Sequence, residues 1–278
     1  MAGPVIFLHF SNLCGILFLL IDRHERQNGV IMLLVADVGN TSTVFAVYDG
    51  DTLVDTVRTK TGDHKVKELT EKYYPVNMAF ISSVVPSVNE RLKKYLEYLY
   101  ECNVKFLDTE CDTGLKICTD APEKTGADLI CGAAEAFDRY KKPVVVFDLG
   151  TATTVCAVDR EGNYLGHAIY PGVRTSFDAL HRAAEQLPEI DERYDDFELI
   201  GKNTVSSIKS GVIIGAACFI DGMAERYRKE IGEDAAVVVT GGLAPVILPY
   251  CTGKYDYDEF LLLKGLKLIC NRTYNRTK

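Results

Sequence analysis

The sequence lacks the cysteine spacing that metal and redox sites use. Its nine cysteines never form a CxxC pair, and several fall inside apolar strand or helix patterns. A disulfide framework and a cysteine-bound metal are therefore both disfavoured. We expect reduced core cysteines in a protein of the cytoplasm.

Basic residues are also in short supply. The chain has 31 Lys and Arg against 39 Asp and Glu, with a formal net charge of −8 and a pI near 5.2. A chain of this sign has no long-range attraction to nucleic acid or to an anionic lipid surface, so neither is expected as a partner. At 278 residues it is long enough for two domains with cores of their own.

Residues 1–31 form an N-terminal extension that lacks the marks of a targeting segment. Its apolar run at 4–21 is interrupted by His9, Ser11 and Asn12, no Lys or Arg precedes the run, and no A-x-A site follows it. Because Met32 directly begins the first strand pattern, we expect translation to start there and the extension not to be native. A membrane-associating segment and a signal peptide are the alternatives.

The strongest pattern in the chain is a strand–turn–strand stretch at 143–158, PVVVFDLGTATTVCAV. Its apolar β-branched run ends abruptly at an Asp-x-Gly-Thr turn, which places Asp148 at the tip of a buried strand. Gly150 removes a Cβ where another group must approach the backbone, and Thr151 adds a hydroxyl. We interpret this hairpin as a phosphate-binding device.

A second copy of this device lies at 32–47, MLLVADVGNTSTVFAV. Aligning Asp37 with Asp148 without gaps gives six identities in eleven positions, among them Gly39 with Gly150 and Thr43 with Thr154. Because polar and apolar residues match together, the pattern indicates a duplicated domain rather than two unrelated hairpins. We expect domains at 32–142 and 143–278 with a nucleotide cleft between them.

Each half is predicted to contain three strands followed by helix, strand, helix, strand and helix. In the first half we expect a strand at 52–60, a polar helix at 63–74 and a helix whose start is marked by a Ser87–Glu90 capping box. In the second half a long helix should run from Thr204 to Ile231. The order βββαβαβα, occurring twice, predicts an α/β fold of duplicated actin-like ATPase (ribonuclease H-like) domains.

Seven motifs follow one another along residues 32–271. They are DVGNT from Asp37, GAD from Gly126, DLGTATT from Asp148, YPGV from Tyr170, LP at Leu187, KNT at Lys202 with SG at Ser210, and TGGLA from Thr240. In this order they resemble the motifs of type III pantothenate kinases. The resemblance implies a homodimer that phosphorylates pantothenate with ATP to 4'-phosphopantothenate, the first step of coenzyme A biosynthesis.

Chemistry and the resemblance together assign the expected site. Phosphoryl transfer needs charge neutralised around the γ-phosphate, so Asp37 is expected to hold Mg²⁺ through water. The resemblance implies that Asp148 binds K⁺ or NH₄⁺ and that Asp128 is the catalytic base for the acceptor alcohol. A plain helix N-terminal charge is the alternative for Asp128. The expected ATP-binding residues are Asp37, Val38, Gly39, Asn40, Thr41, Ser42, Thr43, Val44, Thr151, Gly241 and Gly242, and the expected substrate-binding residues are Gly126, Ala127, Asp128, Leu129 and Thr204.

Two positions in the expected acceptor pocket depart from the family pattern. Leu129 stands where the family carries Arg, and Thr119 stands where a substrate-contacting Tyr is usual. Three hypotheses follow: a pantothenate kinase with a remodelled pocket, a kinase for another small alcohol, or a non-catalytic regulatory (transcription-accessory) homologue. The intact phosphate motifs favour an enzyme, because a regulator has no need of two phosphate loops.

Overall fold

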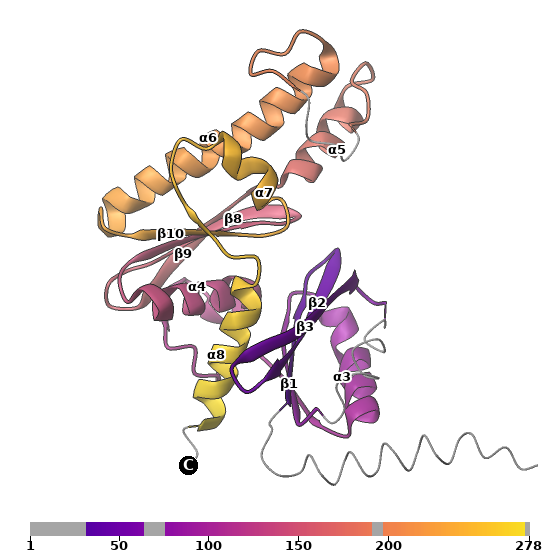
Figure 1. The fold of residues 1–278 in the computed structure, drawn as a ribbon, viewed down its shortest axis with the longest axis vertical. Coiled ribbons are helices and arrows are strands. Elements are labelled where there is room, and N and C mark those ends of the chain that lie inside the picture. Colours follow the sequence, from indigo (N-terminus) through magenta and orange to yellow (C-terminus); the bar gives the residue numbers. More distant parts are fainter. Residues whose placement is uncertain (1–31, 64–75, 191–196, 276–278) are drawn as a thin grey trace, which may run out of the picture.

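A computed structural model of the chain describes residues 32–63, 76–190 and 197–275. Two lobes, each built on a β-sheet, lie one above the other in Figure 1. The N-terminal extension, all but the first residue of the expected helix at 63–74, and residues 191–196 lie outside the described residues.

The lower lobe is organised around a five-stranded sheet in the order β3-β2-β1-β4-β5. Its strands are β1 (Met32–Val38), β2 (Ser42–Asp49), β3 (Thr52–Lys60), β4 (Met78–Ser83) and β5 (Asn103–Phe106). The central strand β1 is buried on both faces, as its unbroken apolar run predicts. It pairs antiparallel with β2 and parallel with β4. Asp37 is thereby held at the carboxyl end of the central strand.

The upper lobe repeats this order in its own sheet. Its strands are β7 (Val144–Leu149), β8 (Ala152–Val158), β9 (Asn163–Pro171), β10 (Ala236–Thr240) and β11 (Asp256–Tyr257), with the short β6 (Lys116–Ile117) added beside β9. The full order is β11-β10-β7-β8-β9-β6, so β7 occupies the place of β1. Asp148 lies at the carboxyl end of β7 as Asp37 does in β1. The expected duplicated actin-like architecture is confirmed.

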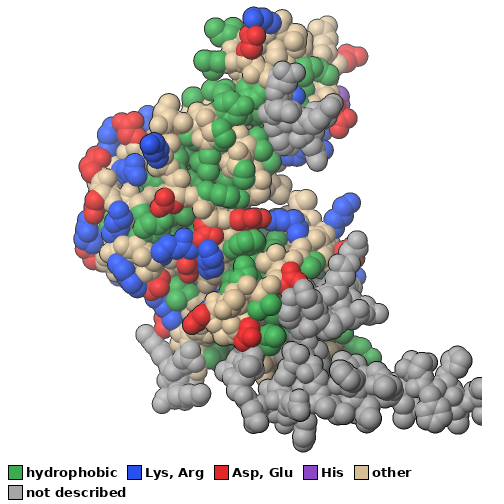
Figure 2. Space-filling view, viewed as in Figure 1, with side chains coloured by type: hydrophobic (Ala, Val, Ile, Leu, Met, Phe, Trp, Pro, Cys, Tyr) green, Lys and Arg blue, Asp and Glu red, His purple; other side chains and the backbone are tan. Residues whose placement is uncertain are grey.

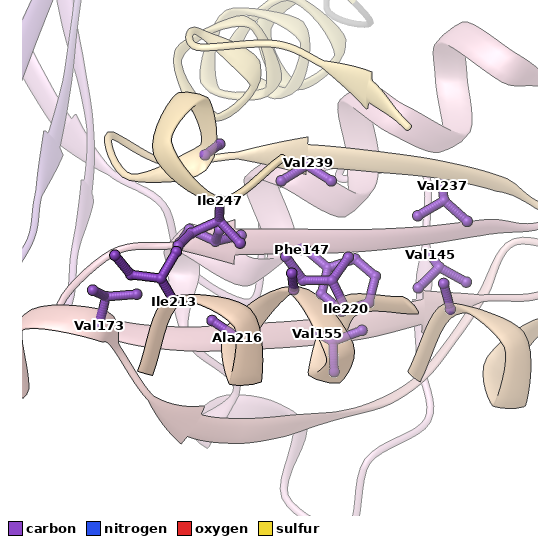
Figure 3. Packing of buried hydrophobic residues seen from close by; sticks show 14 of the residues in the cluster. Val145, Phe147, Val155, Val173, Ile213, Ala216, Ile220, Val237, Val239 and Ile247 are labelled. Atoms are coloured by element: carbon purple, nitrogen blue, oxygen red, sulfur yellow. The ribbon is translucent and has the colours of Figure 1, made fainter. Parts of the chain in front are cut away.

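Helices cover both sheets. They are α3 (Pro86–Tyr100), α4 (Ala127–Tyr140), α5 (Val173–Ala183), α6 (Thr204–Ile231), α7 (Ala244–Ile247) and α8 (Leu261–Asn275), with 3-10 turns at Pro122–Lys124 and Leu248–Tyr250. In Figure 3, Ile220 of α6 lies beside Phe147 of the sheet, whereas Ile213 of the same helix lies on the side of Val173 and Ile247 in the same cluster. Of the described helices, α6 alone is long and apolar enough to cross a membrane, and its most apolar stretch is 44% buried. Its buried residues, Ile213 and Ile220 among them, belong to the core of the upper lobe.

The two lobes exchange their last helices. The helix α4 ends the first half of the chain, yet it packs against β7 and β8 of the upper sheet. Conversely, α8 ends the chain and packs against β1 and β4 of the lower sheet. The two helices cross where a Cβ on Gly265 would lie 2.0 Å from the backbone oxygen of Cys131, so the contact has room for glycine alone. The ranges 32–142 and 143–278 remain the proposed sequence repeats. The packing does not follow them, because α4 lies on the upper sheet and α8 on the lower sheet.

The expected capping box at α3 is wrong, whereas the expected start of α6 is confirmed. The helix α3 begins at Pro86, and the side chain of its N-cap, Val85, caps none of the helix N–H groups. Proline suits the first helical position because its missing N–H needs no partner there, which leaves Ser87 inside the helix. A capping box does form at α6, between Asn203 and Ser206.

Candidate active site

A cleft of about 300 Å³ lies between the lobes and is lined by both hairpins. The space-filling view in Figure 2 shows an indentation between the two lobes at the right of the molecule. Of the expected site residues, it is lined by Asp37, Gly39, Asn40, Thr41, Ser42, Val44, Asp128, Asp148, Thr151, Gly241 and Gly242. Residues far apart in the sequence therefore meet at one place, as the duplicated hairpins predict.

Three aspartates bring negative charge into this cleft from three elements. Asp37 and Asp148 lie at the ends of β1 and β7, and Asp128 lies in the first turn of α4. Burial, with a smaller contribution from the nearby charge of Asp128, raises the pKa of Asp37 and of Asp148 to about 7. Burial also raises the pKa of Asp128, against the opposing effects of the Leu129 backbone N–H and of His167. The three carboxyls thus lie in a place that favours protonation or a bound cation.

The donor set fits a cation held partly by water. Among the described residues, no three His, Cys, Asp or Glu side chains are grouped closely enough to hold a metal ion by themselves. Mg²⁺ usually keeps several waters and binds through one or two carboxylates together with substrate phosphates. The buried hydroxyl of Ser82, beside Asp37, holds down the pKa of that carboxyl but meets hydrogen-bond geometry with none of the described residues. Asp37 and Asp148 therefore suit cations whose remaining ligands are water and phosphate.

The tips of the two hairpins touch across the cleft. The Thr41 and Thr151 hydroxyl oxygens are 3.0 Å apart, which joins loops 110 residues apart in sequence by a hydrogen bond. The first loop is also held by Thr61, the residue after β3, whose hydroxyl donates to the Gly39 carbonyl oxygen at 2.5 Å. Backbone N–H groups and hydroxyls in turns of this kind are the groups that cradle phosphate.

Two glycines allow backbone to pack directly against the second hairpin. Gly241 has a φ of +95°, and a Cβ there would lie 2.6 Å from Oδ1 of Asp148. A Cβ on Gly172 would lie 2.3 Å from the carbonyl oxygen of Thr151. No side chain fits at either place, and positive φ is costly for other residues. The TGG and PGV motifs are thus explained by close packing around Asp148 and Thr151.

The gapless alignment of the two hairpins is wrong by one residue after the turn. Asp37 pairs with Val44 in the first hairpin, whereas Asp148 pairs with Thr154 in the second. The first loop contains one residue more, so Val44 rather than Thr43 is the counterpart of Thr154. Because side chains alternate between the two faces of a strand, this shift turns Thr43 away from the cleft. On that other face, the Thr43 hydroxyl oxygen lies 3.1 Å from the Thr61 hydroxyl oxygen.

Several expected residues do not line the cleft. Val38 is buried in the lower core, and Leu129 packs on an apolar cluster beneath α4. Gly126 and Ala127 are likewise not among the cleft residues, although they directly precede Asp128. Thr204 lines a separate cavity between α5 and α6. Within one chain, then, the structure separates Thr204 from Asp128.

One residue that sequence reasoning missed is Arg58 of β3. It lines the cleft beside Thr56, and its Nη1 donates to the Ser42 hydroxyl at 3.0 Å. The sequence did offer a signal for Arg58. Side chains alternate between the two faces of a strand, so Thr56 and Arg58 share one face of β3, which pairs with the first hairpin.

The raised aspartate pKa values predict a stability that falls as pH rises. Folded Asp37 keeps its proton up to about pH 7, whereas the unfolded chain loses it near 3.8. Between these values the folded state binds more protons, so the free energy of unfolding of the nucleotide-free protein should decrease as pH rises through the window. We expect Asp37→Asn to lessen the decrease between pH 5 and 8 by roughly 1–3 kcal/mol, as measured by urea unfolding. Identical pH profiles for the two proteins would contradict the burial of this charge.

The comparisons with known proteins agree with the motifs. A family model described as type III pantothenate kinase matches residues 33–226. A type III pantothenate kinase of Desulforapulum autotrophicum is 39% identical over 254 residues, covering 87% of this chain and 97% of its own length. The enzymes of that name from Myxococcus xanthus and Paramagnetospirillum magneticum are 36% and 39% identical, each over 87% of this chain and 99% and 97% of their own lengths.

Solved structures share the fold at lower identity. A structure from Campylobacter jejuni described as a Baf family transcriptional activator has a TM-score of 0.57 at 20% identity, covering 87% of this chain and 99% of its own. The ethanolamine utilization protein EutJ of Carboxydothermus hydrogenoformans has a TM-score of 0.50 at 14% identity, covering 85% and 89%. These likenesses concern the fold alone. On the family match and the relatives that span nearly the whole chain, the protein belongs to the type III pantothenate kinase family.

Proposed function

We propose that this protein transfers the γ-phosphoryl group of ATP to the primary alcohol of pantothenate, giving 4'-phosphopantothenate for coenzyme A biosynthesis. One observation carries the proposal: two matched phosphate hairpins and the aspartate of the GAD motif meet in a single cleft between duplicated lobes. Membership in the family supplies the name of the acceptor.

The chain's own residues suit this transfer. The hydroxyl oxygen of the acceptor attacks the γ-phosphorus, the bond from that phosphorus to the β–γ bridging oxygen breaks, and ADP leaves with the bonding electrons. Asp128 takes the hydroxyl proton, because it lies in the cleft with a pKa raised by burial, which makes a carboxylate a better base. The two hairpins orient the phosphates, with Gly39, Asn40, Thr41 and Thr151 as the proposed contacts.

Two cations are part of the proposal. Asp37 would hold Mg²⁺ through water and Asp148 would hold K⁺ or NH₄⁺, each beside a hairpin loop. A cation bound there neutralises charge on the phosphates as the bond to the leaving group breaks. The raised pKa of both carboxyls supports this assignment, since a bound cation would offset the burial, and the smaller repulsion, that disfavour their charged forms.

This chain departs from its family at two positions of the expected acceptor pocket, neither of which lines the cleft. Leu129 lies against the apolar cluster beneath α4, and the hydroxyl oxygens of Thr119 and Thr125 lie 2.9 Å apart in a hydrogen bond. Neither side chain offers a cation to the carboxylate of pantothenate. Arg174, an arginine outside the cleft lining, forms an ion pair with Asp178 of the same helix, α5, at 3.4 Å.

Leu129→Arg therefore tests the acceptor. If pantothenate is the substrate, the new guanidinium can pair with its carboxylate, and we expect the KM for pantothenate to fall roughly ten- to hundred-fold with kcat little changed. Steady-state kinetics at saturating ATP, with Leu129→Met as the apolar control, measures this. A KM that does not improve would favour an uncharged acceptor, because an arginine would then be buried without a partner.

A homodimer is also proposed, because Thr204 lies away from Asp128 within one chain and needs a second chain to reach an acceptor pocket. Exposed apolar residues here are Leu180 of α5, Leu199 and Ile200 before α6, and Val205 in its first turn. Figure 2 shows hydrophobic side chains gathered over the upper lobe. Burying such a patch is favourable between copies of one chain. Sedimentation at micromolar concentration should give a dimer, and a fully active monomer would contradict this. The cytoplasm, where ATP is supplied, is the proposed location.

The proposed activity is tested by ATP consumption with a panel of small hydroxyl compounds, pantothenate included. We expect pantothenate to give the highest kcat/KM of the panel. Preference for another alcohol would establish the altered-acceptor alternative, which the apolar Leu129 favours. No acceptor-dependent turnover at all would favour the regulatory alternative.

A further inference from the structure

The cleft holds far more acidic than basic side chains. Four carboxylates line it, those of Asp37, Asp128, Asp148 and Glu259, and Arg58 is the one cationic side chain among the described lining residues. A polyphosphate entering such a cleft adds further negative charge and needs cations close to its oxygens. Arg58 is therefore the chain's own candidate for binding phosphate in this cleft.

The position of Arg58 is set by strand pairing. It lies directly opposite Val44 in the β2–β3 ladder, two residues along β3 from Thr56, so both side chains face the cleft. Its guanidinium is exposed and donates through Nη1 to the Ser42 hydroxyl at 3.0 Å. Ser42 belongs to the first hairpin, so the guanidinium lies beside a proposed phosphate loop.

The contacts of Arg58 tell in which part of the cleft it lies. Ser42, which accepts its hydrogen bond, and Val44, which lies opposite it, both belong to the first hairpin and both line the cleft. Arg58 thus lies on the phosphate side of the cleft, beside the first hairpin.

We propose that Arg58 binds the terminal phosphate of ATP and remains on that group as it is transferred to the acceptor. The proposal rests on the proposed kinase function. A guanidinium can donate two parallel N–H bonds to phosphate oxygens, and these bonds strengthen as the bond from the γ-phosphorus to the bridging oxygen breaks and charge spreads over the transferred group. The Ser42 hydroxyl holds the guanidinium in place before the nucleotide binds.

The test compares nucleotides that differ by one phosphate. Binding of ADP and of a non-hydrolysable ATP analogue with an imido bridge is measured by calorimetry at fixed Mg²⁺, for the wild type, Arg58→Ala and Arg58→Lys. Arg58→Ala should weaken the ATP analogue roughly ten- to hundred-fold and ADP less than about threefold. Arg58→Lys should fall between, because an ammonium keeps the charge and loses the two-pronged geometry.

Controls separate binding from folding. Arg160→Ala removes an exposed arginine that pairs with Asp234 and is not among the cleft residues, and this variant should bind both nucleotides as the wild type does. Turnover of Arg58→Ala should be partly restored by added guanidinium ion, which a general loss of structure would not allow.

Two results would overturn the proposal: equal weakening of ADP and the ATP analogue, or unchanged binding of both. The readout needs no acceptor, so it is independent of pantothenate. A difference between the nucleotides would stand even if another alcohol were the substrate, whereas loss of the difference would remove Arg58 from the terminal phosphate while leaving the proposed kinase activity intact.

Discussion

Asp128→Asn is expected to lower kcat by roughly 10²–10⁴-fold while leaving nucleotide binding unchanged. The amide cannot accept the proton of the attacking hydroxyl, so transfer loses its base. The fold should survive, because the Oδ1 atom that accepts from the Leu129 backbone N–H at 2.8 Å has an equivalent in asparagine. Steady-state kinetics and calorimetry with the ATP analogue measure the two effects separately.

The contrasting outcome for this variant is clear-cut. If Asp128→Asn kept more than about a tenth of the wild-type kcat, far above the expected range, Asp128 would be a helix N-terminal charge and not a base. Asp138→Asn, on the same helix but outside the cleft, is the matched control. It should change activity little.

Asp37→Asn and Asp148→Asn are each expected to lower turnover by roughly 10²–10³-fold or more, because each removes a negative charge that binds a cation beside the phosphates. Both variants should be folded and, at pH 8, at least as stable as the wild type without nucleotide, since a buried charge is removed. Activity is measured with excess Mg²⁺ and K⁺, and stability by thermal unfolding. Near-normal turnover in either variant would exclude that carboxylate from the reaction.

Much of the fold was predictable because the apolar pattern of each central strand agrees with its place in the sheet. The apolar runs of β1 and β7 read as strands buried on both faces, and the sheet order β3-β2-β1-β4-β5 recurs around both. The exchange of α4 and α8 was not predictable. It depends on contacts such as that of Gly265 with Cys131, which join residues more than a hundred positions apart.

The site was predictable where a motif lies at a strand tip and unpredictable where the register decides. Asp37, Asp148 and Gly241 line the cleft as their motifs indicate. Thr43 does not, because one extra loop residue reverses the faces of β2, and a gapless comparison cannot detect such a shift. Arg58 escaped notice because its role depends on which sheet face closes the cleft, and that is a tertiary property.

The most direct test of the account is the product formed by the purified protein with ATP, Mg²⁺, K⁺ and pantothenate. Mass spectrometry and phosphorus NMR identify the phosphorylated atom, with Asp128→Asn as the inactive control. The account predicts one ADP per pantothenate phosphorylated at its primary hydroxyl. ATP turnover without phosphorylated pantothenate, or equal product from Asp128→Asn, would contradict it.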